Sequence, residues 1–119
     1  GGRTTFLDYA RREQRPDAVF CGNDQLAMGI MDAARFELGW MIPEDMSVVG
    51  FDDVSEAARP GYRLTTVHQD SVEMGRQAVR LLLARLEEPG RRPVRSEVPS
   101  VFIRRGSARL PDSAPNDPA

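Results

Sequence analysis

Two stretches decide the fold of this chain: Val19-Phe20-Cys21-Gly22-Asn23-Asp24 and Val48-Val49-Gly50-Phe51-Asp52-Asp53. Each is a short apolar run that breaks at a glycine and ends in polar side chains. Short runs rich in β-branched and aromatic residues are typical of strands buried on both faces, as in a parallel sheet. We therefore predict a buried strand at each stretch.

The segment between these runs has the length and the end signals of a helix. It covers residues 25–38, and Gly39 and Pro43 follow it as stop signals. Asp24 is placed to cap its first turn. A strand, a helix and a strand of this size form a βαβ unit, whose right-handed crossover makes the two strands parallel and adjacent or nearly so. The predicted fold class is α/β, with a parallel sheet flanked by helices.

Asn23 and Asp52 follow the two predicted strands and should therefore lie at the same carboxyl edge of the sheet. Ligands of open α/β sheets bind at that edge. An Asn amide donates and accepts, and an ionised Asp accepts at two oxygens, so the pair matches vicinal hydroxyls or an amine-bearing base. Either residue alone could simply end a strand and start a turn. Both at one edge favour a small-molecule site.

Other side chains that could take part in catalysis or bind a metal lack the partner residues that such a site requires. Asp52 and Asp53 could hold Mg²⁺, but no Lys and no glycine-rich phosphate loop accompanies them. His68 is the only histidine, so a catalytic triad or zinc site would be incomplete. Cys21 lies in an apolar run and is expected to be a small core residue. We expect no enzymatic activity, no catalytic residue, no metal and no cofactor.

Two more helices are predicted outside the βαβ unit. Residues 4–14 show a short amphipathic pattern. Residues 71–87 carry apolar positions spaced at three and four, and Asp70 with Glu73 resembles a capping box at their start. Pro89-Gly90 ends this second helix.

The rest of the chain gives weaker signals. Residues 64–67 are strand-like in composition, and Gln69 follows them at a junction typical of a hinge or a ligand-facing amide. Residues 94–104 predict two short strands that change direction near Pro99. From residue 107 onward, Pro, Ser, Asp and Ala dominate, and we predict a solvated, disordered tail over 107–119.

Composition places the chain among small globular domains. It has 119 residues, of which 40% are apolar and 29% charged. A net charge of −2 argues against an autonomous nucleic-acid binder. One cysteine cannot form an internal disulfide, and no run approaches the ~18 apolar residues of a membrane span. The first residue is Gly1 rather than Met, which suggests a fragment of a longer protein and leaves secretion undecided.

Two methionines on the first long helix have two interpretations. Met28 falls opposite the apolar face, and we group Met31 with it on that side. Exposed methionines are common and need no special explanation. The alternative is contact with another subunit, because Met is frequent at adaptable interfaces.

The residues as a whole resemble the LacI/GalR family of bacterial transcriptional repressors. The matching blocks occur in the same order and spacing from about residue 1 to 105. They are residues 15–24, 27–29, 42–53 and 64–70, followed by the helix at 74–86.

This resemblance implies a periplasmic-binding-protein-like effector domain of two lobes, with a partial type I, Rossmann-like fold in this chain. Residues 1–66 would belong to the C-terminal lobe, 67–99 would return to the N-terminal lobe, and 100–106 would lead back. Members are cytoplasmic homodimers that bind operator DNA through an N-terminal helix-turn-helix, which this chain lacks. A sugar or nucleobase-like effector in the cleft changes operator affinity.

Position by position, the resemblance assigns roles to residues. Asn23 and Asp52 match effector-contacting residues, and Gln69 matches a contact at an interlobe crossing. Met28, with Met31 beside it, matches the dimer interface. A sugar-binding protein of a transport system is the alternative function, and a phosphate-transferring enzyme using Asp52-Asp53 is a third.

The resemblance also implies that helix 71–87 lacks the sheet it covers in the family. Its apolar face carries Val79, Leu82, Leu83 and Leu86. A face of this kind left in water promotes association. We therefore predict that this chain forms a dimer, native-like or with the helix exchanged.

Overall fold

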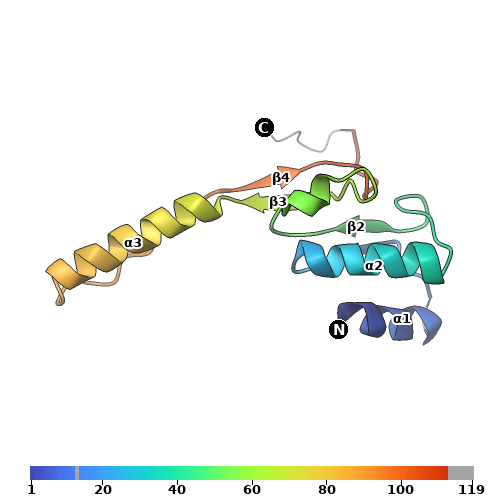
Figure 1. The fold of residues 1–119 in the computed structure, drawn as a ribbon, viewed down its shortest axis with the longest axis horizontal. Helices are drawn as coiled ribbons and strands as arrows, with labels where there is room; N and C mark the ends of the chain where they lie inside the picture. The colour runs from blue at the N-terminus through green and yellow to red at the C-terminus, as the bar shows by residue number, and fades with distance from the viewer. Residues whose placement is uncertain (13, 113–119) are drawn as a thin grey trace. The chain divides into compact units, whose positions relative to one another are not determined.

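A computed structural model describes residues 1–12 and 14–112 of the chain. The elements, labelled in Figure 1, are α1 (Gly2–Arg12), β1 (Ala18–Phe20), α2 (Asp24–Glu37), β2 (Ser47–Val49), the short 3-10 helix η1 (Ser55–Ala58), β3 (Thr66–Gln69), α3 (Ser71–Glu87) and β4 (Ser100–Ile103). The chain divides into two compact units. Unit 1 comprises Gly1–His68 with the chain from Val101 onward, and unit 2 comprises Gln69–Ser100.

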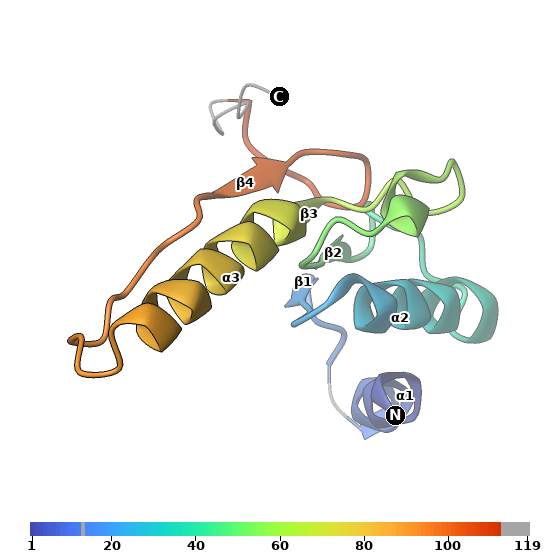
Figure 2. The same cartoon turned by 60° about the vertical axis from the view of Figure 1, so that its left-hand side comes forward.

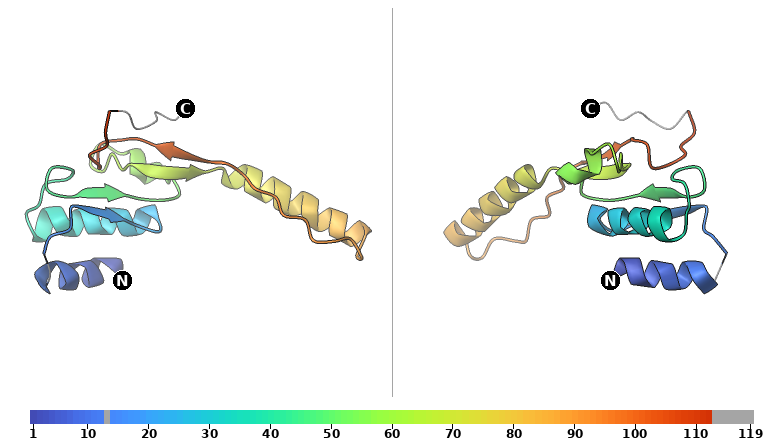
Figure 3. Two further views of the ribbon diagram at one scale, coloured as in Figure 1. Left: turned by 180° about the vertical axis from the view of Figure 1, so that it is seen from behind. Right: turned by 45° about the vertical axis from the view of Figure 1, so that its right-hand side comes forward.

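The predicted βαβ unit is confirmed in unit 1. β1 and β2 pair in parallel, with Val19 opposite Val48, and their common direction is visible in Figure 3. The pairing continues past the strands, because the Cys21 amide donates to the Val49 carbonyl at 2.8 Å. On the other side of β2, the Gly50 amide donates to the Thr65 carbonyl at 2.9 Å. β2 is therefore the middle of three hydrogen-bonded segments.

The two strands differ in burial. Val48 in β2 is fully buried, as predicted, whereas Phe20 in β1 is 66% exposed. The prediction that both strands are buried on both faces is wrong for β1. In the described residues β1 pairs only with β2, so it is the edge of its sheet.

α2 lies beside the parallel strands, as Figure 2 shows. Ala27, Ile30, Met31 and Ala34 are buried on it. Residues three and four apart share one face of a helix, which puts Met31 on the core side with these neighbours. The expectation that Met31 contributes to a dimer interface is therefore wrong. On the other side of α2 lies α1, whose Phe6 and Leu7 are buried.

The cap of α2 also differs from the prediction. Asn23, not Asp24, is the N-cap, and its side-chain oxygen accepts a hydrogen bond of 2.8 Å from the Leu26 amide. Asp24 is the first helical residue and is fully buried. At the other end Gly39 has a φ of +69°, the left-handed conformation expected of the glycine after a helix.

The outward side of α2 is partly covered by the loop that contains η1. The Tyr62 hydroxyl donates to the Asp32 carboxylate at 3.0 Å, and the Arg35 guanidinium donates to the Gly61 carbonyl. Met28 is half-buried and packs against the core cluster together with Tyr62. Its own chain therefore already covers part of this methionine.

Unit 2 consists of α3 and the segment that returns beside it (Figures 2 and 3). Asp70 caps α3 as predicted, because its carboxylate accepts a 2.9 Å bond from the Glu73 amide. No residue of α3 is buried in the described structure, and Leu82 and Leu86 are 58% and 68% exposed. Instead of two strands in 94–104, the structure has the single strand β4, which pairs with β3.

The chain after β4 is ordered further than predicted. Ser107 is fully buried, and its hydroxyl donates to the Val48 carbonyl at 2.6 Å and accepts from the Thr65 amide at 2.8 Å. The tail predicted from residue 107 is therefore wrong at its start, since a small hydroxyl satisfies two buried backbone groups there. Residues 113–119 of that prediction lie outside the described residues. Among the described residues, every helix is too short or too polar to cross a lipid bilayer.

Candidate functional site

The ends of β1 and β2 bring Asn23 and Asp52 to one edge of the sheet. The backbone amide of Asp24 donates to the carbonyl of Phe51 at 2.9 Å, which joins the residues next to the pair. The predicted placement of both residues at the carboxyl edge is thus confirmed. This is the edge at which open α/β sheets bind ligands.

Asn23 has a structural duty at this edge in addition to any binding role. Its side-chain oxygen caps α2, while its amide nitrogen takes no part in that bond. This hydrogen bond fixes the Asn23 side chain at the carboxyl edge of the sheet, where it is half-buried. An amide held by its oxygen presents its N–H groups as donors in a fixed orientation.

Asp52 lies on a strained turn. Its φ is 117°, and that of Asp53 is 56°. Two successive non-glycine residues with positive φ are unusual, and each costs on the order of 1–3 kcal/mol. The Asp52 amide donates to the Val67 carbonyl at 2.9 Å, which attaches the turn to the start of β3. Strain of this kind concentrates at functional sites.

Asp53, in contrast, is engaged within the protein. One carboxylate oxygen accepts from the Arg105 guanidinium at 2.7 Å, and the other lies 3.1 Å from Nδ1 of His68. Its side chain is only 17% exposed. A carboxylate occupied by two basic side chains does not pair with Asp52 to hold a metal. Residues 1–12 and 14–112 contain no group of three or more His, Cys, Asp or Glu side chains arranged to bind a metal ion.

Asp24 is a fully buried carboxylate next to the site, and both of its oxygens accept hydrogen bonds from the protein. One of its oxygens accepts a 2.5 Å bond from the Thr66 hydroxyl, and the other accepts a 2.9 Å bond from the Val54 amide. It also lies in the first turn of α2, where the helix dipole favours a negative charge. Asp24 therefore holds the backbone that follows the strained turn.

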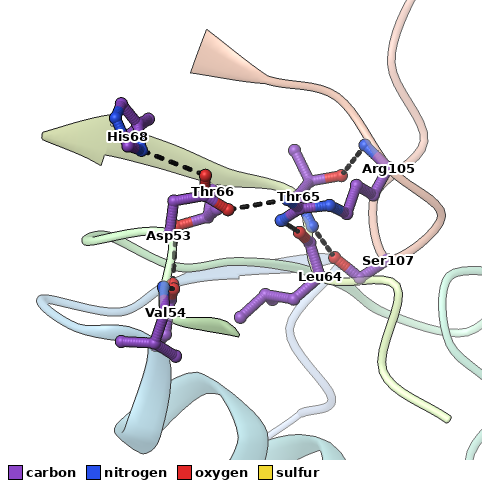
Figure 4. A network of polar contacts seen from close by, with 9 residues as sticks. Asp53, Val54, Leu64, Thr65, Thr66, His68, Arg105 and Ser107 are labelled. Atoms are coloured by element: carbon purple, nitrogen blue, oxygen red, sulfur yellow. Dashed lines mark hydrogen bonds and ion pairs between the residues drawn. The ribbon is translucent and has the colours of Figure 1, made fainter. Parts of the chain in front are cut away.

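A second set of contacts connects the turn to the chain after β4 (Figure 4). The Arg105 amide donates to the Thr65 hydroxyl at 3.0 Å, and its guanidinium donates to the Leu64 carbonyl at 3.0 Å. Sequence reasoning missed Arg105 and Ser107, because no local pattern relates them to residues forty or more positions earlier. An Arg and a Ser after an apolar strand were the only available signal.

The remaining predicted residues are placed as follows. Gln69 is the last residue of β3 and the first of unit 2. Cys21 is buried as predicted, and burial with the nearby Asp24 carboxylate raises the pKa of its thiol from 9.0 to about 11. A thiol with so high a pKa is not a nucleophile at neutral pH.

Comparisons with known proteins agree with this geometry. A family model described as a periplasmic binding protein-like domain matches residues 3–108. The ribose operon repressor of Escherichia coli (strain K12) is 36% identical over 91% of this chain and 32% of its own length. A LacI family transcriptional regulator from Enterococcus faecium with bound ribose is 31% identical, with a TM-score of 0.75 over 91% of this chain and 39% of that one.

A lac repressor dimer bound to operator and an anti-inducer is 28% identical, with a TM-score of 0.81 over 92% of this chain and 37% of that one. The chain spans about a third of the length of the curated repressor it matches. The resemblance to the LacI/GalR family is confirmed by these matches, as is the partial type I fold. With 106 consecutive positions inside one family model, the chain belongs to the periplasmic binding protein-like family, in the form found in LacI-type regulators.

Proposed function

We propose that this chain is the effector-binding and dimerisation part of a LacI/GalR-type transcriptional regulator that acts as a repressor in the cytoplasm. The observation that carries the proposal is the pair Asn23 and Asp52 at one sheet edge, with Asp52 on a strained turn. The role is binding rather than catalysis. The relatives at this level of identity are repressors.

The proposed effector is a small metabolite, either a polyhydroxylated sugar or a nucleobase-like compound. Asp52 accepts hydrogen bonds from ligand hydroxyl or amine groups, and Asn23 donates from its amide nitrogen. The Enterococcus faecium regulator, which shares the fold, has ribose bound. Gln69 is the proposed third contact, contributed from the end of β3.

The division of the chain supports the proposed lobes. The two units separate between His68 and Gln69 and again between Ser100 and Val101. These points lie within two residues of the lobe boundaries expected from the family, at 66/67 and 99/100. Unit 1 would be the C-terminal lobe and unit 2 the part that belongs to the N-terminal lobe.

DNA binding and dimerisation belong to the longer protein in this proposal. Operator DNA is bound by a helix-turn-helix outside this chain, since a net charge of −2 gives this part no attraction for phosphates. Met28 and the loop around Tyr62 form the proposed contact with a second subunit. The similar lac repressor structure is a dimer bound to operator.

Calorimetric titration of the full-length protein with ribose, cellobiose and a purine base tests the effector site. We expect one of these ligands to bind, and Asp52→Ala to cost on the order of 2–4 kcal/mol of affinity, because ligand donors are left unpaired. Asp8→Ala, on the exposed side of α1, is the matched control and should change nothing. Equal affinities of wild type and Asp52→Ala would remove Asp52 from the site.

The sequence upstream of this chain distinguishes the regulator from its alternative. A helix-turn-helix there supports the repressor. A signal peptide in its place would instead support a sugar-binding protein of a transport system.

A further inference from the structure

We infer that Arg105 is the positioning residue that sets the orientation of Asp52 toward the effector. The inference rests on the proposed function for the role of Asp52. It concerns the strained turn at Asp52-Asp53, which must be held by contacts from outside, since its own backbone conformation is unfavourable.

One of those contacts is an ion pair with Arg105. Its guanidinium donates to the Asp53 carboxylate at 2.7 Å, and the two side chains are only 20% and 17% exposed. A charged hydrogen bond shielded from solvent is stronger than one on the surface. Since Asp53 is covalently next to Asp52, fixing its carboxylate limits how the Asp52 side chain can rotate about the turn.

Arg105 can act as an anchor because its position is fixed by its own backbone amide, by its guanidinium and by the backbone of the next residue. Its backbone amide donates to the Thr65 hydroxyl at 3.0 Å, and a second guanidinium nitrogen donates to the Leu64 carbonyl at 3.0 Å. The next residue, Gly106, donates to the Arg63 carbonyl at 2.7 Å. The guanidinium thus spans from the Leu64 carbonyl, in the segment entering β3, to the Asp53 carboxylate of the strained turn (Figure 4).

The geometry requires an arginine at this position. The forked guanidinium donates to Leu64 and Asp53 from two different nitrogens. A lysine keeps the charge but offers one compact ammonium, which cannot reproduce the fork. His68, 3.1 Å from the other Asp53 oxygen and 44% exposed, supports the carboxylate from the β3 side but does not replace the anchor.

The first test is hydrogen–deuterium exchange on the full-length protein without ligand. Arg105→Met should raise the exchange rates of the Asp52 and Val54 amides roughly tenfold, since the turn opens more often. Arg105→Lys should give a smaller increase. The control is Arg104→Met, because Arg104 is exposed and donates to Leu110 and Pro111 instead of Asp53. Unchanged exchange at residues 52–54 in Arg105→Met overturns the inference, whatever the effector is.

The second test is a double-mutant cycle measured by ribose titration. Arg105→Met should weaken binding about tenfold, the equivalent of one hydrogen bond to a charged group. In an Asp52→Asn background the same change should weaken the affinity little further. If Arg105→Met only destabilised the fold, it would weaken the affinity equally in both backgrounds. If Asp52→Asn weakens binding and Arg105→Met does not, or if the two effects simply add, the inference is wrong and the proposed function stands. If ribose does not bind, the cycle is measured with whichever of cellobiose or the purine base does. If Asp52→Asn has no effect on that binding, the proposed ligand role of Asp52 fails and the exchange experiment alone decides the anchor.

Discussion

The Thr66 hydroxyl donates a 2.5 Å hydrogen bond to the Asp24 carboxylate, and both side chains are fully buried. This bond joins the first turn of α2 to the first residue of β3. Because the second Asp24 oxygen accepts from the Val54 amide, a single carboxylate connects three segments beneath the candidate site.

We predict that Asp24→Ala lowers the free energy of unfolding by roughly 1–3 kcal/mol for each buried group it leaves unbonded. Those groups are the Thr66 hydroxyl and the Val54 amide. Urea denaturation measures the change. Asp8→Ala, an exposed carboxylate on α1, should stay within about 0.5 kcal/mol of wild type. A similar small change for Asp24→Ala would mean that water or a shifted side chain satisfies both groups.

Gly50 is predicted to tolerate no side chain. A Cβ there would lie 2.2 Å from an Asp24 carboxylate oxygen and 2.9 Å from a methyl carbon of Leu64. Gly50→Ala should destabilise the protein by about 1–3 kcal/mol, because buried neighbours must move. The matched change is Gly29→Ala, where no neighbouring atom lies within 4 Å of the added Cβ. The higher helix propensity of Ala should stabilise the folded protein by about 0.5–1 kcal/mol. Thermal unfolding of both variants would reveal the opposite signs, and equal shifts would contradict the close approach at Gly50.

Cys21 is predicted to react slowly with alkylating reagents in the native state. Its pKa is raised from 9.0 to about 11, first by burial and then by the Asp24 carboxylate, so very little thiolate exists at pH 8. Labelling by iodoacetamide should be much faster in denaturant than in buffer. A native labelling rate equal to the denatured rate would show that the thiol is accessible and ionised.

The same pKa shift predicts a loss of stability in alkali. Since the folded state holds the thiol proton more tightly than the unfolded chain, this contribution is fully present below pH 9.0 and is lost as the pH rises through about 11. Cys21→Ala should therefore show a flatter decline of unfolding free energy between pH 9 and 11. Parallel declines in the two proteins would contradict the shift.

The apolar face of α3 is predicted to drive association of this chain when it is produced alone. Val79, Leu82, Leu83 and Leu86 are each more than half exposed. Burying a few hundred Å² at ~25 cal/mol per Å² is worth several kcal/mol before entropy costs. Light scattering over a concentration series should give a dimer, and Leu82→Asp should cause dissociation or precipitation. The control is Arg80→Ala on the same helix. A compact monomer unaffected by Leu82→Asp would show that this face needs no cover.

Local sequence patterns were sufficient for the βαβ unit, for α3 and for the edge of the sheet where the candidate site lies, but not for residues 94–104, where one strand forms instead of two. α3 begins and ends where its spacing and its Asp70 cap predict, and α2 differs by one residue at each end. Asn23 and Asp52 could be placed together because a right-handed βαβ crossover leaves no other arrangement for the ends of two parallel strands. Periodicity, stop signals and crossover handedness are properties of consecutive residues, so one sequence is enough to read them.

Tertiary structure alone decided which partners the polar residues around the site take within the protein. Asp24, expected as a helix cap, is instead buried and accepts a hydrogen bond from Thr66. Asp53 is the partner of Arg105, fifty-two positions away. Ser107 entered the core for the same reason. A buried polar or charged group must find a partner, and the partner is whichever group the packing of distant segments brings within hydrogen-bond distance. That choice depends on three-dimensional packing, which the spacing of neighbouring residues does not encode.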